Sequence, residues 1–309
     1  MKKFILSFVF AGVVVYMIAF PESAYSAASE AVTLCISAIL PTLFVFMVCS
    51  DFFVSAGIGK IIKKPFSRFM RPVFSIGGAG ALALALGLVS GYPVGAKCVC
   101  NLYEKKDITK NEAERLLGFC NNCSPIFVIG SVGTVMLKSK DLGYILCSVH
   151  IVAAIICGMV LRLFRKENPY ELMHRDEIGS VSISLIKAVT DSVKNSLFSV
   201  LTVCAYTVLF SQIISMVYFI FGQNFITYVL GGIIEITNSV SKTALSGESI
   251  KLILPAISFM LGFGGMCVHL QTAAIVKNTN LSLKLYIAGK IMHGIFSFII
   301  TFALTRIIM

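Results

Sequence analysis

The chain has 309 residues, of which 57% are apolar and only 13% are charged, and its formal net charge is +11. An average soluble domain carries about a quarter charged residues, and the mean hydropathy here is +0.89. These values exclude an ordinary soluble domain. The long unbroken apolar runs also exclude a membrane β-barrel, whose strands are short segments of alternating polarity. The sequence therefore predicts an all-α membrane protein with several spanning helices.

The basic residues lie in short loops between apolar segments and form no arm or stripe. This distribution follows the positive-inside rule, so we expect a lipid bilayer and no nucleic acid as partner. The ten cysteines lie mostly within apolar segments. A free thiol behaves there as a small hydrophobe, so no disulfide framework is expected.

Residues 1–29 form the first predicted unit, in which Lys2 and Lys3 precede an apolar stretch that ends near Phe20. This stretch is either a first spanning helix or a cleaved signal peptide, and it leaves an external loop. The next apolar segment, residues 31–53, returns to the cytoplasm. It is followed at residues 59–71 by five cations interleaved with apolar residues, a pattern typical of a helix that lies in the membrane interface.

The apolar run at residues 73–99 is interrupted by S-G-Y-P-V-G-A-K at residues 90–97. A second cationic loop follows at residues 103–115. If the run crossed the membrane once, this loop would lie outside, against the positive-inside rule. Gly91, Pro93 and Gly95 suit a non-helical turn, which is tolerated at membrane depth only where protein or a watery cavity satisfies its backbone. The pattern predicts a re-entrant helical hairpin.

An internal repeat is indicated by two pairs of similar stretches that occur in the same order along the chain. Residues 42–53 resemble residues 196–207, and residues 86–97 resemble residues 261–272. In the predicted topology the two copies have opposite orientations, a pattern typical of secondary transporters. The alternative is that apolar sequences resemble one another by chance.

We therefore expect a polytopic helical bundle with two inverted repeats, each with a re-entrant hairpin and broken helices. The second hairpin is expected to turn near Gly264. The predicted units are residues 1–29, a first repeat at 30–163, a cytoplasmic loop at 164–181 and a second repeat at 182–309.

Polar residues within apolar segments are functional candidates, because a polar group in a bilayer is costly. Asn121 and Asn122, close to Pro125, indicate an unwound joint or the cap of a half-helix whose free N–H groups hold an anion. A plain cap at the membrane surface is the alternative. Lys97 either pairs with an anionic substrate or extends to the cytoplasmic interface.

Glu235 either carries a proton, binds Na⁺ or hydrogen-bonds the other hairpin. Lys290 and His293 lie three residues apart and should face the bundle interior. The predicted solute-binding residues are Ser90, Gly91, Tyr92, Pro93, Gly95, Lys97, Asn121, Asn122, Ser124, Glu235, Asn238, Gly264, Gly265, His269 and Gln271.

The pairs Cys98/Cys100 and Cys120/Cys123 raise the question of a zinc site. Four thiolates would have to converge from separate segments, and no matching His spacing lies nearby, so no metal or other cofactor is expected. The sequence contains no Walker loop, nucleophile elbow or HExxH motif. We therefore do not expect an enzyme.

Several motifs together resemble the YlbJ-type sporulation integral membrane proteins, which carry the nucleoside-recognition gate domain also found in nucleoside transporters and ferrous-iron permeases. The motifs are L-P-T-L-F at 40–44, M-R-P at 70–72, S-G-Y-P-V-G-A-K at 90–97, E-A-E-R at 112–115, F-C-N-N-C-S-P at 119–125, G-I-I-E-I-T at 232–237 and L-G-F-G-G at 261–265. The resemblance covers about residues 30–305. Cys120 and Cys123 replace Ser or Asn of the family, which weakens any role for these two side chains.

The resemblance implies a small-solute permease of endospore-forming bacteria, in the membrane around the forespore, that moves dipicolinate or another small aromatic anion. We expect alternating access in a multi-pass protein of the cell membrane, with a coupling ion and a homo-oligomer left open. One alternative is a membrane scaffold that recruits proteins through residues 60–71 and 162–176. The other is a proton- or sodium-coupled nucleoside carrier.

Overall fold

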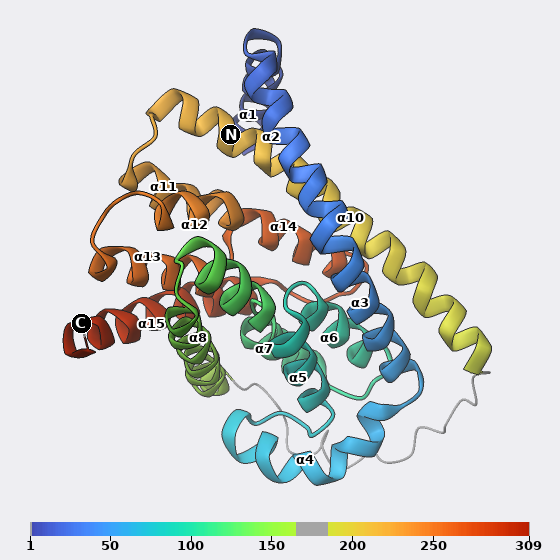
Figure 1. Ribbon diagram of the computed structural model, residues 1–309. Coiled ribbons are helices and arrows are strands. Elements are labelled where there is room, and N and C mark those ends of the chain that lie inside the picture. Colours follow the sequence, from blue (N-terminus) through green and yellow to red (C-terminus); the bar gives the residue numbers. More distant parts are fainter. Residues whose placement is uncertain (1, 165–184, 309) are drawn as a thin grey trace.

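The computed structural model describes residues 2–164 and 185–308 (Figure 1). Within these ranges the chain is helical, with short connections and no β-strand. The predicted all-α class is therefore confirmed. The predicted cytoplasmic loop at 164–181 lies, apart from residue 164, outside the described residues.

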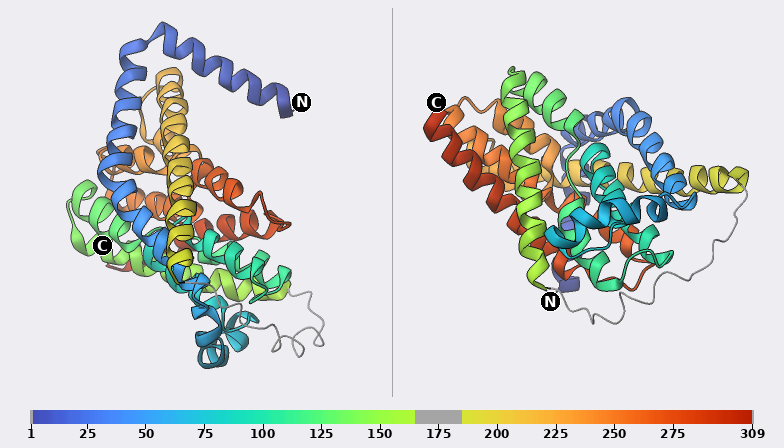
Figure 2. Two further views of the ribbon diagram at one scale, coloured as in Figure 1. Left: turned by 90° about the vertical axis from the view of Figure 1, so that its right-hand side faces the viewer. Right: turned by 90° about the horizontal axis from the view of Figure 1, so that it is seen from below.

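Two long rods run along one side of the molecule. Helix α2 (Pro21–Leu34) continues through the π-helical turn η1 (Cys35–Ile39) into α3 (Leu40–Ser55), and α10 (Leu185–Phe221) packs along both α2 and α3 (Figure 1). Helix α1 (Lys2–Ala19) projects from the top of this pair (Figure 2). The axes of α1 and α2 differ by 110° at a bend before Pro21, which suits a first helical position.

Helix α4 (Ile58–Phe74) bends away from α3 by 84° after Gly57, whose φ is +78°. The side chains of Lys60, Lys64, Arg68 and Arg71 are exposed, whereas Met70 and Phe74 are fully buried. A helix with separate cationic and apolar faces, set across the end of a spanning rod, suits the interfacial position predicted from the sequence.

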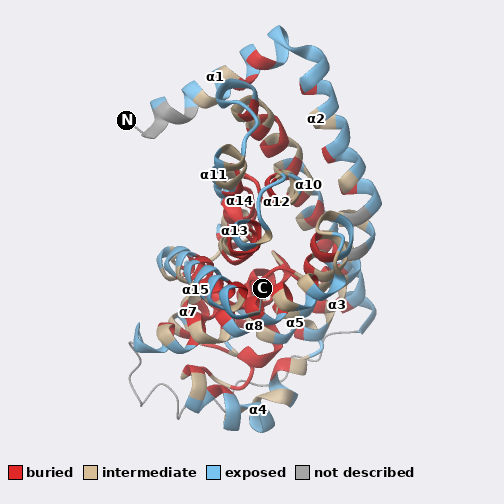
Figure 3. Cartoon of the chain, turned by 60° about the vertical axis from the view of Figure 1, so that its left-hand side comes forward, coloured by how far each residue is buried: buried red, intermediate tan, exposed pale blue. Residues whose placement is uncertain are grey.

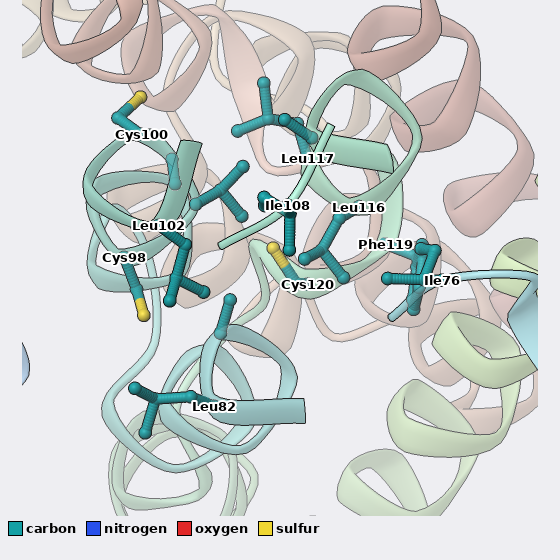
Figure 4. Packing of buried hydrophobic residues seen from close by; sticks show 14 of the residues in the cluster. Ile76, Leu82, Cys98, Cys100, Leu102, Ile108, Leu116, Leu117, Phe119 and Cys120 are labelled. Carbon is teal, nitrogen blue, oxygen red and sulfur yellow. The ribbon is translucent and has the colours of Figure 1, made fainter. Parts of the chain in front are cut away.

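A helical hairpin forms at the predicted S-G-Y-P-V-G-A-K stretch. Helices α5 (Gly80–Ser90) and α6 (Val94–Glu104) fold back on each other, and both pack against α7 (Lys110–Cys120). Gly87 and Gly95 lie against the main chain of Cys120, and a Cβ on Gly95 would be 3.0 Å from the Cys120 carbonyl carbon. Figure 4 shows the buried side chains that pack between these three helices, Leu82 and Leu116 among them.

Helix α7 begins with a capping box in which Thr109 and Glu112 each bond the other's backbone N–H. After a break at residues 121–124 the chain continues as the π-helix η2 (Ile126–Met136), which packs on α8 (Lys140–Leu161). Helix α8 ends in the short 3-10 turn η3 (Arg162–Phe164).

The second hairpin lies at Glu235, not at Gly264 as predicted. Helices α11 (Phe225–Ile234) and α12 (Ile236–Ala244) pack against each other around Glu235. In contrast, α13 (Ile250–Phe263) and α14 (Gly265–Val276) form one candidate span of 27 residues across Gly264. The chain does not turn back there, because α14 packs on α6 and α10 beyond the break. Helix α15 (Lys284–Ile308) then runs beside α13, α7 and α8.

Apart from α4, which occurs in the first half alone, the same order of elements occurs twice in the described ranges: a long helix, a hairpin, a broken helix and a long helix. The hairpins in corresponding places are α5–α6 and α11–α12. The predicted match of residues 86–97 with residues 261–272 is therefore wrong as a match of two hairpins. Residues 86–97 form a hairpin turn, whereas residues 261–272 lie in a helix that is interrupted at Gly264 and continues without turning back.

Four segments in the described ranges are long and apolar enough to cross a membrane, or up to six if each bent pair is one span. The four are Lys140–Phe164, Leu185–Phe221, Ile250–Val276 and Lys284–Ile307. Large apolar side chains such as Phe8, Phe198 and Ile299 are exposed, and the buried residues gather in the middle of the molecule (Figure 3). Apolar outer surfaces around a packed interior are typical of helices that face lipid.

Candidate functional site

A cavity of about 280 Å³ lies where the interrupted helices meet the two rods. The α5–α6 turn, the α7–η2 break, the α11–α12 turn and the first turns of α14 contribute its polar walls. The rods α2–η1–α3 and α10 close it with side chains that are apolar except for Thr207 on α10. Six of the fifteen predicted solute-binding residues line the cavity: Ser90, Gly91, Tyr92, Ser124, Glu235 and Gln271.

The tip of the α5–α6 hairpin touches the α7–η2 break. Gly91 has a φ of +85°, a conformation that glycine adopts without strain, and a Cβ there would lie 2.9 Å from the Ser124 backbone nitrogen. The Cys123 thiol donates to the Tyr92 hydroxyl across 2.9 Å. These contacts fix the hairpin tip against the broken helix.

The α7–η2 break is an unwound joint inside the protein. Asn121, Asn122 and Cys123 are buried, and the Cys123 N–H donates to His150 Nε2 on α8 across 3.0 Å. Ser124 Oγ accepts from the Phe127 N–H across 3.3 Å and so begins η2. Of the two sequence alternatives, the structure shows the joint and not a cap at the molecular surface.

Asn121 and Asn122 hold the joint and do not line the cavity. The Asn121 Nδ2 donates to Thr272 Oγ1 on α14 across 2.9 Å. The Asn122 Nδ2 donates to the Phe119 carbonyl across 2.8 Å, within its own helix end. Both side chains therefore tie the break to its surroundings, while their neighbour Ser124 faces the solute space.

Glu235 supplies the carboxylate of the cavity and is only 3% exposed. Its two oxygens accept from the backbone N–H groups of Thr237 and Asn238, each across 2.8 Å. A carboxylate at this position satisfies two N–H groups of the first turn of α12 and complements the helix dipole. The same contacts explain why α11 ends and α12 begins at this residue.

On α14, Cys267, Val268 and Gln271 line the cavity, and Gln271 Nε2 lies 3.3 Å from Cys267 Sγ. His269 points elsewhere, since its Nδ1 pairs with the Tyr286 hydroxyl on α15 across 2.9 Å. Gly264 produces the break that starts α14, with a φ of +90°. The remaining predicted residues Pro93, Gly95 and Gly265 also lie at breaks without lining the cavity, and Asn238 lines a separate cavity of about 420 Å³ beside α1 and α10.

Lys97 does not reach the cavity, contrary to the anion-binding alternative. Its ammonium lies 3.4 Å from Asp51 Oδ2 on α3 and donates to the Asn195 carbonyl and Ser199 Oγ on α10, across 3.0 and 2.7 Å. It also does not extend to the surface, since it is 7% exposed. Lys97 therefore ties the hairpin arm α6 to both rods.

Several lining residues were not predicted from the sequence. They lie on apolar helices or beside the breaks, and they line the cavity only because the rods pack there; no local signal distinguishes them. They are Leu34, Ile39, Leu43, Cys123, Ile126, Phe127, Ser131, Met136, Val203, Thr207, Ile236, Thr237, Cys267 and Val268.

Within the described ranges no group of three or more His, Cys, Asp or Glu side chains is arranged to hold a metal ion. Cys98, Cys100, Cys120 and Cys123 are free, buried thiols. Lys290 and His293 are both fully buried, which confirms that they face the interior of the bundle.

Comparison with known proteins gives one informative similarity. The chain is 26% identical over 317 residues to the sporulation integral membrane protein YlbJ of Bacillus subtilis (strain 168), which covers 91% of this chain and 77% of that protein. No family model and no solved structure matches the chain. The similarity confirms the resemblance to YlbJ-type proteins. Together with the long apolar helices it supports an integral membrane protein associated with sporulation.

Proposed function

We propose that the protein is a membrane permease that carries a small solute through the cavity between its interrupted helices. The supporting observation is that the α5–α6 turn, the α7–η2 break, the α11–α12 turn and α14 all meet at this cavity. Interrupted helices are costly in a membrane and occur where their free backbone groups line a cavity. In secondary transporters such breaks form the solute site at the interface of two repeats.

The two hairpins are proposed to be re-entrant and the two halves of the chain to be inverted repeats. The repeated order of long helix, hairpin, broken helix and long helix supports the repeat. The position of the cationic helix α4 and of the loop after α6 on one face would follow from the positive-inside rule. Access to the cavity would alternate between the two faces as the hairpins move against the rods.

The first candidate solute is a small carboxylate anion such as dipicolinate. The N-termini of η2, α12 and α14 contribute first-turn residues to the cavity, and a helix N-terminus attracts negative charge. The volume of about 280 Å³ is at the lower end for ligand sites and suits a small molecule. The similarity to a sporulation protein supports a place in the membrane around the forespore.

The second candidate is a nucleoside, and the charge of the lining favours it. Among the described residues no lysine or arginine lines the cavity, whereas Glu235 and Gln271 offer oxygen atoms to sugar hydroxyls. The cation on which the anion hypothesis depended, Lys97, is paired with Asp51 outside the cavity. Both candidate solutes are therefore compared in the same uptake experiment.

With either solute, the protein is proposed to move the molecule without converting it chemically. The proposed partners are the solute, the lipid and a coupling ion.

The test is uptake of labelled dipicolinate and uridine into proteoliposomes that contain the purified protein. Gln271→Leu would place an apolar side chain against the solute, and Gly91→Leu would press on Ser124. Gly130→Leu is the matched control, because a Cβ at Gly130 meets no atom within 4 Å. We expect uptake of one solute by the wild type and the control and a loss of at least about tenfold in both cavity variants. Wild-type protein that moves neither solute would favour the scaffold alternative.

A further inference from the structure

Lys290 is a fully buried cation in the second turn of α15, and it does not line the solute cavity. Its ammonium donates to the main-chain carbonyl of Asn121 across 2.9 Å and lies 3.3 Å from His293 Nδ1. Asn121 is the residue at which α7 ends, so the ammonium sits on the negative end of the helix dipole. A buried ionisable residue within a membrane span marks a functional site by default.

The hydrogen bonds around Lys290 can all be satisfied with uncharged partners. His293 Nε2 lies 2.9 Å from the His150 carbonyl, which can only accept, so His293 carries its proton on Nε2 and offers Nδ1 to Lys290. His150 in turn accepts from the Cys123 N–H at Nε2. The two imidazole rings are 4.4 Å apart.

No carboxylate in the described part of the chain forms an ion pair with Lys290. The titratable side chains around it are His293 on α15, His150 and Cys157 on α8, Cys120 at the end of α7, Cys123 in the α7–η2 break, and His269 on α14. A buried ammonium without an anion is stable only as long as its neutral partners stay in place.

Lys290 also lies directly behind the solute cavity. A Cβ on Gly264 would be 3.8 Å from the Lys290 side chain and 3.8 Å from the ring of Tyr92, which lines the cavity. Lys290 therefore contacts the end of one broken helix and adjoins the break of the other. Movement of either break would change its surroundings.

We propose that Lys290 is the proton-exchange site that couples solute transport to a proton gradient, an inference that depends on the proposed permease function. In the described state the charged Lys290 holds Asn121 at the break. When the break moves, the ammonium loses this carbonyl and gives one proton to water that enters the cavity from one face of the membrane. The neutral amine then takes up one proton from water at the opposite face before the break closes again, so one proton crosses the membrane per cycle.

The test is solute accumulation in proteoliposomes under an imposed pH gradient, with the membrane potential clamped. One proton per solute predicts about tenfold accumulation for a difference of about one pH unit in the wild type. Lys290→Met should abolish gradient-driven accumulation. Lys284→Met, an exposed site on the same helix, should behave as the wild type.

Lys290→Arg separates coupling from a purely structural role. Arginine stays protonated and keeps the charge at the end of α7, so a structural role predicts full rescue, whereas proton exchange predicts loss of accumulation. Two results would overturn the inference and leave the permease function intact. One is solute accumulation by the wild type that does not depend on the pH gradient, and the other is gradient-driven accumulation by Lys290→Met.

A second measurement does not require transport, so it also applies to variants that are inactive. It applies as well if the wild type moves neither solute, a result that would refute the permease function and not the proton-exchange site. Potentiometric titration of the purified wild type and Lys290→Met, over the pH range in which both stay folded, should differ by about one proton. Identical titration curves would refute proton exchange at Lys290.

Discussion

The ion pair between Asp51 and Lys97 gives the strongest stability prediction. Both side chains are less than 10% exposed, at 5% and 9%, and the Asn101 amide donates to Asp51 Oδ1 across 2.5 Å. Asp51→Asn keeps the shape but removes the negative charge, and so leaves the Lys97 ammonium buried without an anion. Breaking a buried pair in this way costs about 3–5 kcal/mol of unfolding free energy.

The double variant Asp51→Asn/Lys97→Met removes both charges and should recover at least about 2 kcal/mol of that loss, since no unpaired charge remains. The assay is denaturant unfolding of the wild type, both single variants and the double variant in the same detergent. Losses that simply add in the double variant would refute the structural role of the pair. Because Lys97 lies outside the cavity, the double variant should also keep the wild-type KM for the solute, and a raised KM would contradict this placement.

Three further variants test the site. Gly95→Ala should cost about 1–3 kcal/mol, because its methyl group would press on the Cys120 main chain, while Gly130→Ala should be tolerated; denaturant unfolding measures both. Glu235→Gln should lose about 1.5–3 kcal/mol, because an amide nitrogen would face an N–H group of α12, and unfolding together with solute uptake should report it. Tyr92→Phe should cost about 1 kcal/mol and slow the reaction of Cys123 with a small thiol reagent, since the reacting thiolate loses the hydroxyl that stabilises it; an unchanged reaction rate would contradict the contact.

The positions of two chain breaks could be read from the sequence because their signals are local. Gly91 and Pro93 lie in the first turn, and Pro125 follows the joint; each acts on its own backbone whatever surrounds it. The direction of the chain after a break is different, because it depends on packing. Gly264 carries a strong local signal, yet α14 continues beyond it against α6 and α10.

Glu235 shows the opposite case, a turn with little local signal. Ser, Thr, Asp and Asn are the usual residues at a helix start, so a glutamate in an apolar stretch indicated a functional group instead of a turn. Both alternatives for Lys97, pairing with the solute and extending to the cytoplasmic interface, failed for a related reason. Its partner Asp51 lies on α3 and Ser199 on α10, and no local pattern brings these segments together.

The central claim, that water and solute reach the cavity from each face in turn, is tested most directly by labelling Ser124→Cys. Ser124 lines the cavity, and the ten native cysteines give the background, which the wild type measures. In oriented proteoliposomes an impermeant thiol reagent should modify Cys at this position from one face without solute and from the other during transport. A thiol that stays unmodified from both faces would contradict the account.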